Sequence, residues 1–198
     1  MIGLPFATLT WPVRLYGLLL GIMLLSVPAR ASEPVSPVYR VCFNYDCNRL
    51  QTVRLSPEEW QVVANQFRPA ATTAAEERDM IRRAIAVLEH VSGTQTPTHR
   101  DRGGNAIPEN THGQMDCIDE STNTSGYLTL LEAYGLLRWH RVAERAYRAP
   151  YWVDVHWAAQ IVETETQQRY VVDSWFLDNG EMPYVQVLND WLRKEPIE

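Results

Sequence analysis

The sequence has few of the features that mark membrane-spanning, nucleic-acid-binding or repeat proteins. One apolar run occupies residues 15–27 and no second run of that length follows, and this run is shorter than the roughly 20 residues that cross a bilayer. The arginines are scattered among acidic residues and the formal net charge is −6, so there is no basic stripe for nucleic acid. No internal repeat is apparent. The sequence therefore predicts an acidic globular protein with no nucleic-acid partner.

The first 31 residues have the pattern of a secretory signal peptide. Arg14 precedes the apolar run 15–27, and an Ala-x-Ala site of the kind that signal peptidase cuts ends at Ala31. We therefore expect cleavage after Ala31 and a periplasmic or secreted protein with no stable membrane span. The alternative is an uncleaved membrane anchor, because Arg14 is the only positively charged side chain before the run.

The remaining residues, 32–198, are predicted to form a single domain. The 198 residues less the 31 of the signal peptide leave 167, enough for a real hydrophobic core. Cleavage removes Arg14 and Arg30 and no acidic residue, so the formal charge changes from −6 to −8. Most of the tryptophans stay in the mature chain, and large aromatic side chains build a core or line a cleft.

The three cysteines separate into a pair and a single residue. Cys42 and Cys47 are five positions apart, with turn-forming Asn44 and Asp46 between them, and this spacing lets a disulfide close a tight loop in an oxidising compartment. Cys117 is then unpaired, and an unpaired cysteine in an exported protein is a candidate reactive thiol. The alternative is a buried structural cysteine.

Cys117 lies at the start of a predicted helix. Asp116 is a typical cap residue and Asp119 completes a capping-box pattern, so Cys117 falls in the first turn. The positive end of the helix dipole favours the thiolate, which is the form that attacks a carbonyl carbon. Asp116, Asp119 and Glu120 are interpreted as cap and first-turn acids, and calcium ligation by these three is the alternative. No other cofactor is predicted.

The pattern of apolar residues predicts an α+β fold, with helices first, then the cysteine helix, and an antiparallel sheet at the end of the chain. Ser56 and Thr73 are the predicted caps of two early helices, the first of which is expected to end near Pro69. The apolar stripe of the second helix should pack on the cysteine helix. Residues 93–110 are predicted to be a loop that forms a cleft rim or a lid. The predicted strands are residues 39–43, 50–55, 139–147, 151–163, 168–176 and 184–188.

A histidine and an aspartate on adjacent predicted strands supply what a thiolate nucleophile needs, a base and a group that orients the base. If the hairpin turns at residues 164–167, the numbers of paired positions sum to about 331, which places His156 diagonal to Asp173 on one face. The alternative for His156 is a core histidine with a structural role. His112 and His140 are rival bases, but neither has a carboxylate placed as Asp173 is for His156.

These residues carry a resemblance to a known family. An Asp-Cys-x-Asp sequence that opens a helix, followed by a histidine on one strand and an aspartate on the next, resembles the bacterial transglutaminase-like cysteine proteinases, exported members of the papain-like thiol enzymes that cut proteins. The resemblance covers roughly residues 113–175. It implies a papain-like or transglutaminase-like core in which Cys117 is the nucleophile, His156 the general base and acid, and Asp173 the residue that orients the imidazole. Ile118 stands where the family often has an acidic residue, at a position where some relatives are said to carry calcium.

Two groups are candidates for holding the oxyanion of such a reaction. One is the backbone N–H of Cys117 at the helix start, and the other is the side-chain amide of Gln114. For Gln114 the alternative is plain solvation in a loop. A zinc site formed by His99, His112 and Cys117 lacks a paired-ligand motif, so no zinc is predicted.

Two classes of function remain open. The first is an exported thiol enzyme that transfers the acyl group of an amide to water, as a peptidase or amidase, or to an amine, as a transglutaminase. The resemblance to proteinases favours hydrolysis of a protein or peptide substrate. The second is a non-catalytic envelope binding protein on the same fold, with a buried Cys117 and a groove lined by tryptophans. Replacing Cys117 by serine separates the two, because only an enzyme would lose turnover while keeping its fold.

Overall fold

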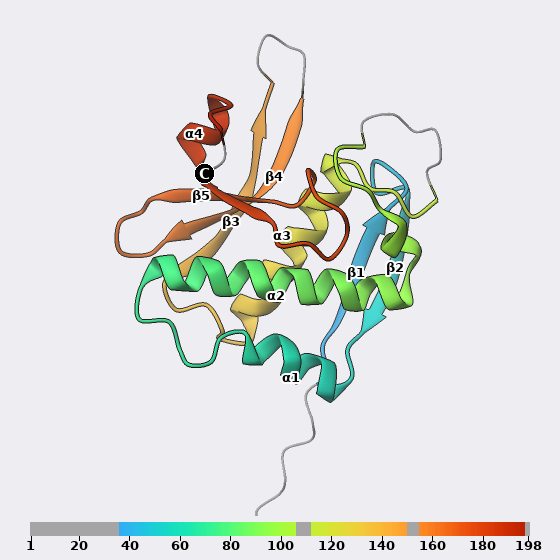
Figure 1. Cartoon of the computed structure of the whole chain (residues 1–198), viewed down its shortest axis with the longest axis horizontal. Helices are drawn as coiled ribbons and strands as arrows, with labels where there is room; N and C mark the ends of the chain where they lie inside the picture. Colours follow the sequence, from blue (N-terminus) through green and yellow to red (C-terminus); the bar gives the residue numbers. More distant parts are fainter. Residues whose placement is uncertain (1–35, 106–111, 150–154, 197–198) are drawn as a thin grey trace, which may run out of the picture. The chain divides into compact units, whose positions relative to one another are not determined.

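The computed structural model describes residues 36–105, 112–149 and 155–196. The predicted signal peptide and the start of the strand predicted from residue 151 lie outside the described residues. Within them, no helix is long and apolar enough to cross a membrane. Helices are combined with two antiparallel sheets (Figure 1), which confirms the predicted α+β class.

The N-terminal hairpin forms as predicted. β1 (Val38–Phe43) pairs with antiparallel β2 (Arg49–Arg54). Residues 44–47 between the strands all have positive φ values, from 51° to 70°, which draws the chain into a tight loop. Cys42 and Cys47 form the predicted disulfide across this loop.

α1 (Pro57–Asn65) begins at the predicted cap. Ser56 Oγ accepts the N–H of Glu59 at 3.1 Å, and Glu59 Oε2 accepts the N–H of Ser56 at 2.7 Å, which completes a capping box. The expectation that this helix continues to near Pro69 is wrong. The N–H groups of residues 66–68 bond to carbonyls three positions back rather than four, so the α-helical pattern stops at residue 65.

α2 (Ala74–Gln95) is the long helix in front of α3 (Cys117–Ala133) in Figure 1. It begins after Thr73, whose side chain accepts the N–H of Glu76 at 3.2 Å. The apolar stripe of α2 shares one hydrophobic core with α3, which agrees with the predicted packing of the two helices. Core residues with no exposed surface include Ile81, Ala84, Ile85 and Leu88 of α2 and Leu128 and Leu131 of α3.

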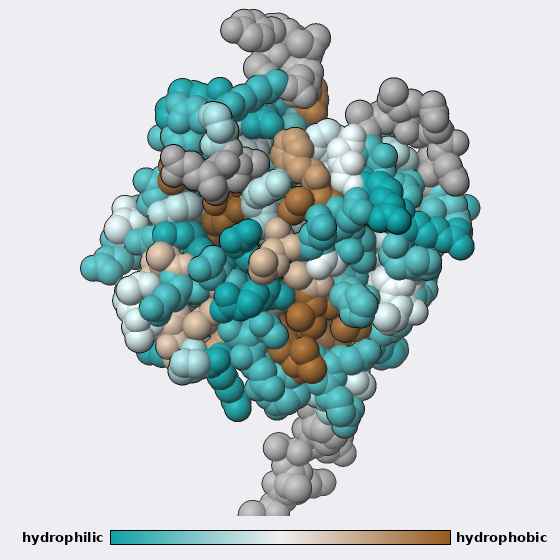
Figure 2. All heavy atoms as spheres, in the orientation of Figure 1, coloured by the Kyte–Doolittle hydropathy of each residue, from teal (hydrophilic) through white to brown (hydrophobic). Residues whose placement is uncertain are grey.

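Some apolar surface at the edge of this core is exposed between α1 and α2, where Figure 2 shows a hydrophobic patch on a mostly hydrophilic face. Val62, Val87 and Val91 line a shallow groove there. Neither Cys117 nor His156 lines this groove, so it is separate from the predicted catalytic residues.

The second sheet has four strands in the order β3, β4, β5, β6, all antiparallel. Ala159 of β4 lies opposite Val172 of β5, and their numbers sum to 331, which confirms the predicted register. β5 ends at Asp173, three residues earlier than predicted, because the chain turns over residues 174–177. The strands are β3 (His140–Arg148), β4 (His156–Glu163), β5 (Arg169–Asp173) and β6 (Tyr184–Val187).

Different helices cover the two faces of this sheet. Ala159 and Val172 face the core that contains α2 and α3. Ala158 and Val171, their neighbours along the strands, pack against Trp191 of the short helix α4 (Leu188–Leu192). Side chains alternate between faces along a strand, so positions 156 and 173 belong to the face covered by α4.

The segment 93–110 has more regular structure than predicted. α2 continues to Gln95, and the 3₁₀ helix η1 (Pro97–Arg100) follows it. Thr96 joins the two, since its side chain accepts the N–H of Thr98 and its backbone N–H bonds to the last turn of α2. The prediction of a plain loop is therefore wrong for residues 93–100, and residues 106–111 lie outside the described part.

The chain after η1 is fixed against the turn that follows β5. The N–H of Gly104 donates to the carbonyl of Trp175 at 2.7 Å. A Cβ atom on Gly103 would lie 2.4 Å from the carbonyl oxygen of Phe176, so only glycine allows this close approach. The N–H of Gly103 also donates to Asp178 Oδ1 at 3.0 Å. These contacts hold the described part of the segment against residues 175–178, and its predicted role as a cleft rim or lid stays a prediction.

Candidate active site

The start of α3 places Cys117 at the first helical position. Asp116 Oδ1 accepts the N–H groups of Ile118 at 3.0 Å and Asp119 at 2.9 Å, and Asp119 Oδ2 accepts the N–H of Asp116 at 3.3 Å. This is the capping box that the sequence predicts. Cys117 is half-buried and is not part of a disulfide. Because it is the first residue of α3, its free thiol lies at the positive end of the helix dipole.

The disulfide hairpin holds this helix start in place. The N–H groups of residues 46 and 47 donate to Asp116 Oδ2 at 3.0 Å and to Asp119 Oδ1 at 2.8 Å. One turn further along α3, Asn123 bonds to both backbone groups of Cys42, at 2.7 Å to its N–H and 2.8 Å to its carbonyl. The Cys42–Cys47 loop therefore orients the residue that carries the thiol.

His156, the first residue of β4, connects the thiol to a carboxylate. Its Nε2 lies 2.7 Å from Asp173 Oδ2, and both side chains are buried. Because Nε2 is taken by Asp173, Nδ1 is the ring nitrogen left for the hydrogen bond with Cys117. Burial alone would lower the pKa of His156, but the hydrogen bonds and charges of Asp173 and Cys117 outweigh it and raise the pKa to about 9.

Aromatic rings surround the imidazole of His156. Its ring centre lies 4.9 Å from that of Trp175, 5.2 Å from that of Phe176 and 5.6 Å from that of Trp191. Trp191 Nε1 also donates to Asp173 Oδ2 at 2.9 Å, the oxygen that binds His156. The rings keep water away from the pair, and electron-rich ring faces favour a charged imidazolium.

Gln114 lies just before the helix, and its side chain holds the chain after η1. Gln114 Nε2 donates to the carbonyl of Arg100 at 2.6 Å, and its Oε1 accepts the N–H of Arg102 at 3.2 Å and the amide of Asn105. These contacts give Gln114 a structural task, and its predicted oxyanion role stays a prediction. The backbone N–H of Cys117 is not used by the cap of α3.

The three acids predicted as alternative calcium ligands act in different places. Asp116 and Asp119 accept backbone N–H groups, as described above, whereas Glu120 hydrogen-bonds to Asp101. In the described part of the chain, the group whose potential ligand atoms lie within 4.8 Å of one another is Cys42, Cys47 and Asp119, two of which form the disulfide. The contacts support the cap and first-turn interpretation, and calcium ligation stays the untested alternative.

Several carboxyl groups are buried beneath the start of α3. Glu89 of α2 accepts the Ser174 hydroxyl at 2.8 Å and the N–H of Gly180 at 3.0 Å, and so ties α2 to the turn after β5. Burial raises the pKa of Glu89 and of Asp101 to about 7, and it raises the pKa of Glu120 well above its usual range. The neutral, protonated forms of these groups are therefore the ones that the fold favours.

Two of the other histidines in the described residues, His140 and His99, have structural settings. His140 Nδ1 lies 2.9 Å from Glu77 Oε1, and Glu77 also accepts the N–H groups of residues 138–140. This buried pair lies far along the chain from the thiol and holds the start of β3. His99 Nδ1 lies 3.1 Å from the carbonyl of Gly93, and His112 is exposed.

Sequence reasoning missed three residues that hold this site. Trp191 binds the carboxylate of Asp173, Asn123 binds the disulfide strand, and Glu89 binds the turn after β5. Asn123 and Glu89 lie on predicted helices. A polar residue on the apolar side of a predicted helix is the sequence pattern that could have indicated their roles. For Trp191 the only signal is an aromatic residue near the end of the chain.

Comparisons of the chain with models of known protein families, with curated proteins and with solved structures found no match.

Proposed function

We propose that this protein is an exported cysteine-dependent enzyme that transfers the acyl group of an amide to water, on a transglutaminase-like core. The observation that carries the proposal is the position of His156, which bonds to Asp173 at 2.7 Å and whose pKa is raised by its interactions with both Asp173 and Cys117. The capped start of α3 and the antiparallel sheet behind it support the transglutaminase-like assignment.

In the first half of the reaction, Cys117 Sγ attacks the amide carbonyl carbon. The backbone N–H of Cys117 at the helix start is the donor to the oxyanion. The pKa of His156 is raised to about 9, so its imidazole carries a proton at neutral pH. His156 gives this proton to the leaving nitrogen, the C–N bond breaks, and an acyl thioester on Cys117 remains.

In the second half, water attacks the thioester. His156, now neutral, accepts a proton from the water, and Asp173 stabilises the imidazolium that forms. The C–S bond breaks, the carboxylic acid leaves, and the Cys117 thiolate and the His156 imidazolium with which the reaction began are restored. The likeness of the motif to cysteine proteinases favours water over an amine as the acyl acceptor.

Peptide cleavage in oxygen-18 water tests the reaction without knowledge of the substrate. The mature, disulfide-intact protein is incubated with a peptide library made from a bacterial proteome, and mass spectrometry identifies new carboxyl termini that carry the label. A parallel sample with a biotin-labelled primary amine detects transamidation. Cys117→Ser is the matched control, since it changes a single atom of the side chain.

The proposal predicts labelled termini that depend on Cys117. Biotin incorporation that depends on Cys117 would keep the thiol chemistry but make an amine the acceptor. Identical products from the protein and from Cys117→Ser would remove the enzymatic proposal, and a binding protein on this fold would take its place.

A further inference from the structure

A pocket of about 360 Å³ opens beside His156, within the size range of small-molecule sites. It lies between the ends of β3 and β4 and the helix α4, which are neighbours in Figure 1. His156 forms part of its wall, together with the three aromatic rings that surround the imidazole. No described residue of α3 lines it, so the pocket belongs to the His156 side of the site.

The pocket wall contains an arginine without a carboxylate partner. Arg148, the last residue of β3, stacks its guanidinium 4.3 Å from the ring centre of Trp191, and its Nη1 donates to the Trp191 carbonyl at 2.5 Å. No carboxylate of the described residues forms an ion pair with it, and the carboxylate whose charge acts on it, Asp173, is bound to His156. Four other arginines do form such pairs: Arg78, Arg82, Arg102 and Arg193.

Two hydrogen-bond donors of the pocket lining find no acceptor. Arg148 Nε and Trp175 Nε1 are both buried, and neither has a hydrogen-bond partner in the described part of the chain. A buried donor without an acceptor destabilises the folded protein. Both donors belong to side chains that line the pocket, so a shift of these side chains toward the acceptor oxygens of a ligand would satisfy them.

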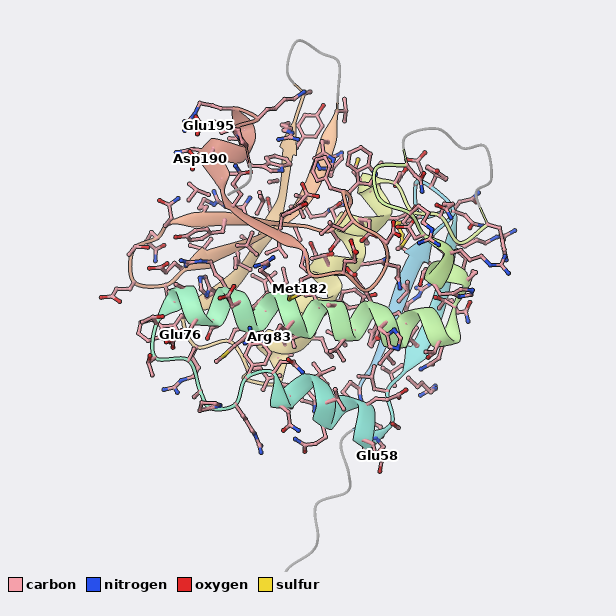
Figure 3. All side chains as sticks on the ribbon, in the orientation of Figure 1. Glu58, Glu76, Arg83, Met182, Asp190 and Glu195 are labelled. Atoms are coloured by element: carbon pink, nitrogen blue, oxygen red, sulfur yellow. A yellow bond between two sulfur atoms is a disulfide. The ribbon has the colours of Figure 1, made fainter. Side chains whose placement is uncertain are left out.

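The charges around the pocket are positive on balance. Arg148 and Lys194 line it, and the one acidic residue of the lining is Glu195, labelled beside α4 in Figure 3. Glu195 is already bound by Arg193 Nε at 2.7 Å. The whole chain has a formal charge of −6, whereas the lining of this pocket is positively charged. The local positive charge favours the binding of an anion.

We infer that this pocket is a subsite for a carboxylate on the leaving side of the scissile amide, with Arg148 as its partner. The leaving side follows from the proposed function, on which this inference rests: His156 protonates the leaving nitrogen, and His156 forms the pocket wall. The rings of Trp175 and Trp191 contact the carbon atoms of the bound residue. The substrate is therefore a peptide with a carboxylate immediately after the cleaved bond.

Two sources can supply that carboxylate, an acidic side chain and a peptide C-terminus. Three chloroacetyl compounds separate them: chloroacetyl-glutamic acid α-amide has only the side-chain carboxylate, chloroacetyl-glutamine only the terminal one, and chloroacetyl-glutamine amide has neither. Cys117 Sγ displaces chloride from the CH₂ carbon of each compound and forms a thioether, and the thiol proton goes to His156 or the buffer. Intact-mass spectrometry follows the adduct, with iodoacetamide as a reagent that needs no subsite.

We expect one of the carboxylate compounds to label Cys117 about tenfold faster than the neutral compound. Arg148→Gln should bring this rate ratio close to one, and Arg148→Lys should keep part of it because the charge remains. Arg141→Gln is the matched control, since Arg141 is exposed at the other end of β3 and is not part of this pocket. The ratio is measured within each variant on folded protein, because unfolded chains label at the same rate with all three compounds and would bring the ratio toward one.

The outcomes separate the subsite from the proposed function. Faster labelling by the side-chain or by the terminal carboxylate assigns the source. Equal rates for all three compounds, or a preference that survives in Arg148→Gln, would overturn the subsite. Labelling of Cys117 by iodoacetamide in the same samples would still support the reactive thiol of the proposed function. A folded protein whose Cys117 resists iodoacetamide as well would overturn the proposed function and the subsite with it.

Discussion

Replacing Asp173 by asparagine removes the charge that holds His156 and keeps the shape of the side chain. Asp173 Oδ2 accepts from His156 Nε2 at 2.7 Å and from Trp191 Nε1 at 2.9 Å, so asparagine must turn its oxygen toward both donors. Its NH₂ group then faces the N–H of Trp175, which now donates to Asp173 Oδ1 at 3.3 Å. The geometry survives, but the negative charge and one weak acceptor are lost.

The size of the effect follows from the pKa of His156. This pKa is 6.5 in an unperturbed histidine and about 9 in the folded protein, and the interval corresponds to about 3 kcal/mol of stability. Asp173 contributes more of the increase than Cys117 does. We therefore expect Asp173→Asn to lower the free energy of unfolding by about 2 kcal/mol at about pH 6.

The sign of the pH dependence is fixed by the direction of the shift. The folded state holds the proton of His156 more tightly than the unfolded state. The contribution of this proton to the free energy of unfolding is therefore complete below pH 6.5 and is lost as the pH rises through about 9. The stability difference between the protein and Asp173→Asn should therefore shrink between about pH 6 and pH 9.5.

Urea unfolding at several pH values and NMR titration of labelled histidine test this prediction. The pKa of His156 should fall toward or below 6.5 in the variant, because burial is then opposed mainly by Cys117. Asp79→Asn, on the exposed side of α2, is the matched control and should change stability by less than about 0.5 kcal/mol. An unchanged pKa of about 9, or a stability difference that is constant with pH, would refute the ion-pair description.

Three further predictions concern the supports of the site. Trp191→Phe keeps an aromatic ring but loses the hydrogen bond to Asp173, and it should lower the free energy of unfolding in urea by about 1–3 kcal/mol. An unchanged free energy would mean that this hydrogen bond does not stabilise the site. Replacing Cys42 and Cys47 by serine should lower the free energy of unfolding by about 2 kcal/mol, because the disulfide closes a short loop. It should also slow the alkylation of Cys117, and an unchanged alkylation rate would show that the loop does not orient the thiol. The pKa of Glu89 is raised to about 7 by burial, so wild-type stability should fall as the pH rises from about 4.5 to 7, and Glu89→Gln should flatten that slope in thermal unfolding; a slope equal to that of the wild type would contradict the assignment.

The features that the sequence predicts well are local ones. The capping boxes at Ser56 and Asp116 depend on residues three positions apart, and the disulfide depends on a five-residue spacing. The β4–β5 register follows from a short polar turn at residues 164–167, because a hairpin fixes which positions lie opposite each other. This register alone places His156 and Asp173 on one face of the sheet.

The features that the sequence does not predict depend on contacts between distant segments. α2 continues through residues 93–95 because Gly93 fits closely against His99 and the turn after β5, and no local pattern signals that fit. The bond from Trp191 to Asp173 and the stacking of Arg148 on Trp191 require α4 to fold back on the sheet. Helix ends and side-chain partners of this kind are decided by packing rather than by local preference.

The most direct test of the central claim is the rate at which iodoacetamide alkylates Cys117 as a function of pH. The mature protein is used with the Cys42–Cys47 disulfide intact, so that one thiol is free. We expect alkylation at neutral and mildly acidic pH that largely disappears in a folded His156→Ala variant, because no imidazole then holds a proton beside the sulfur. A thiol that reacts only when the protein unfolds, or that reacts equally in the variant, would contradict the central claim.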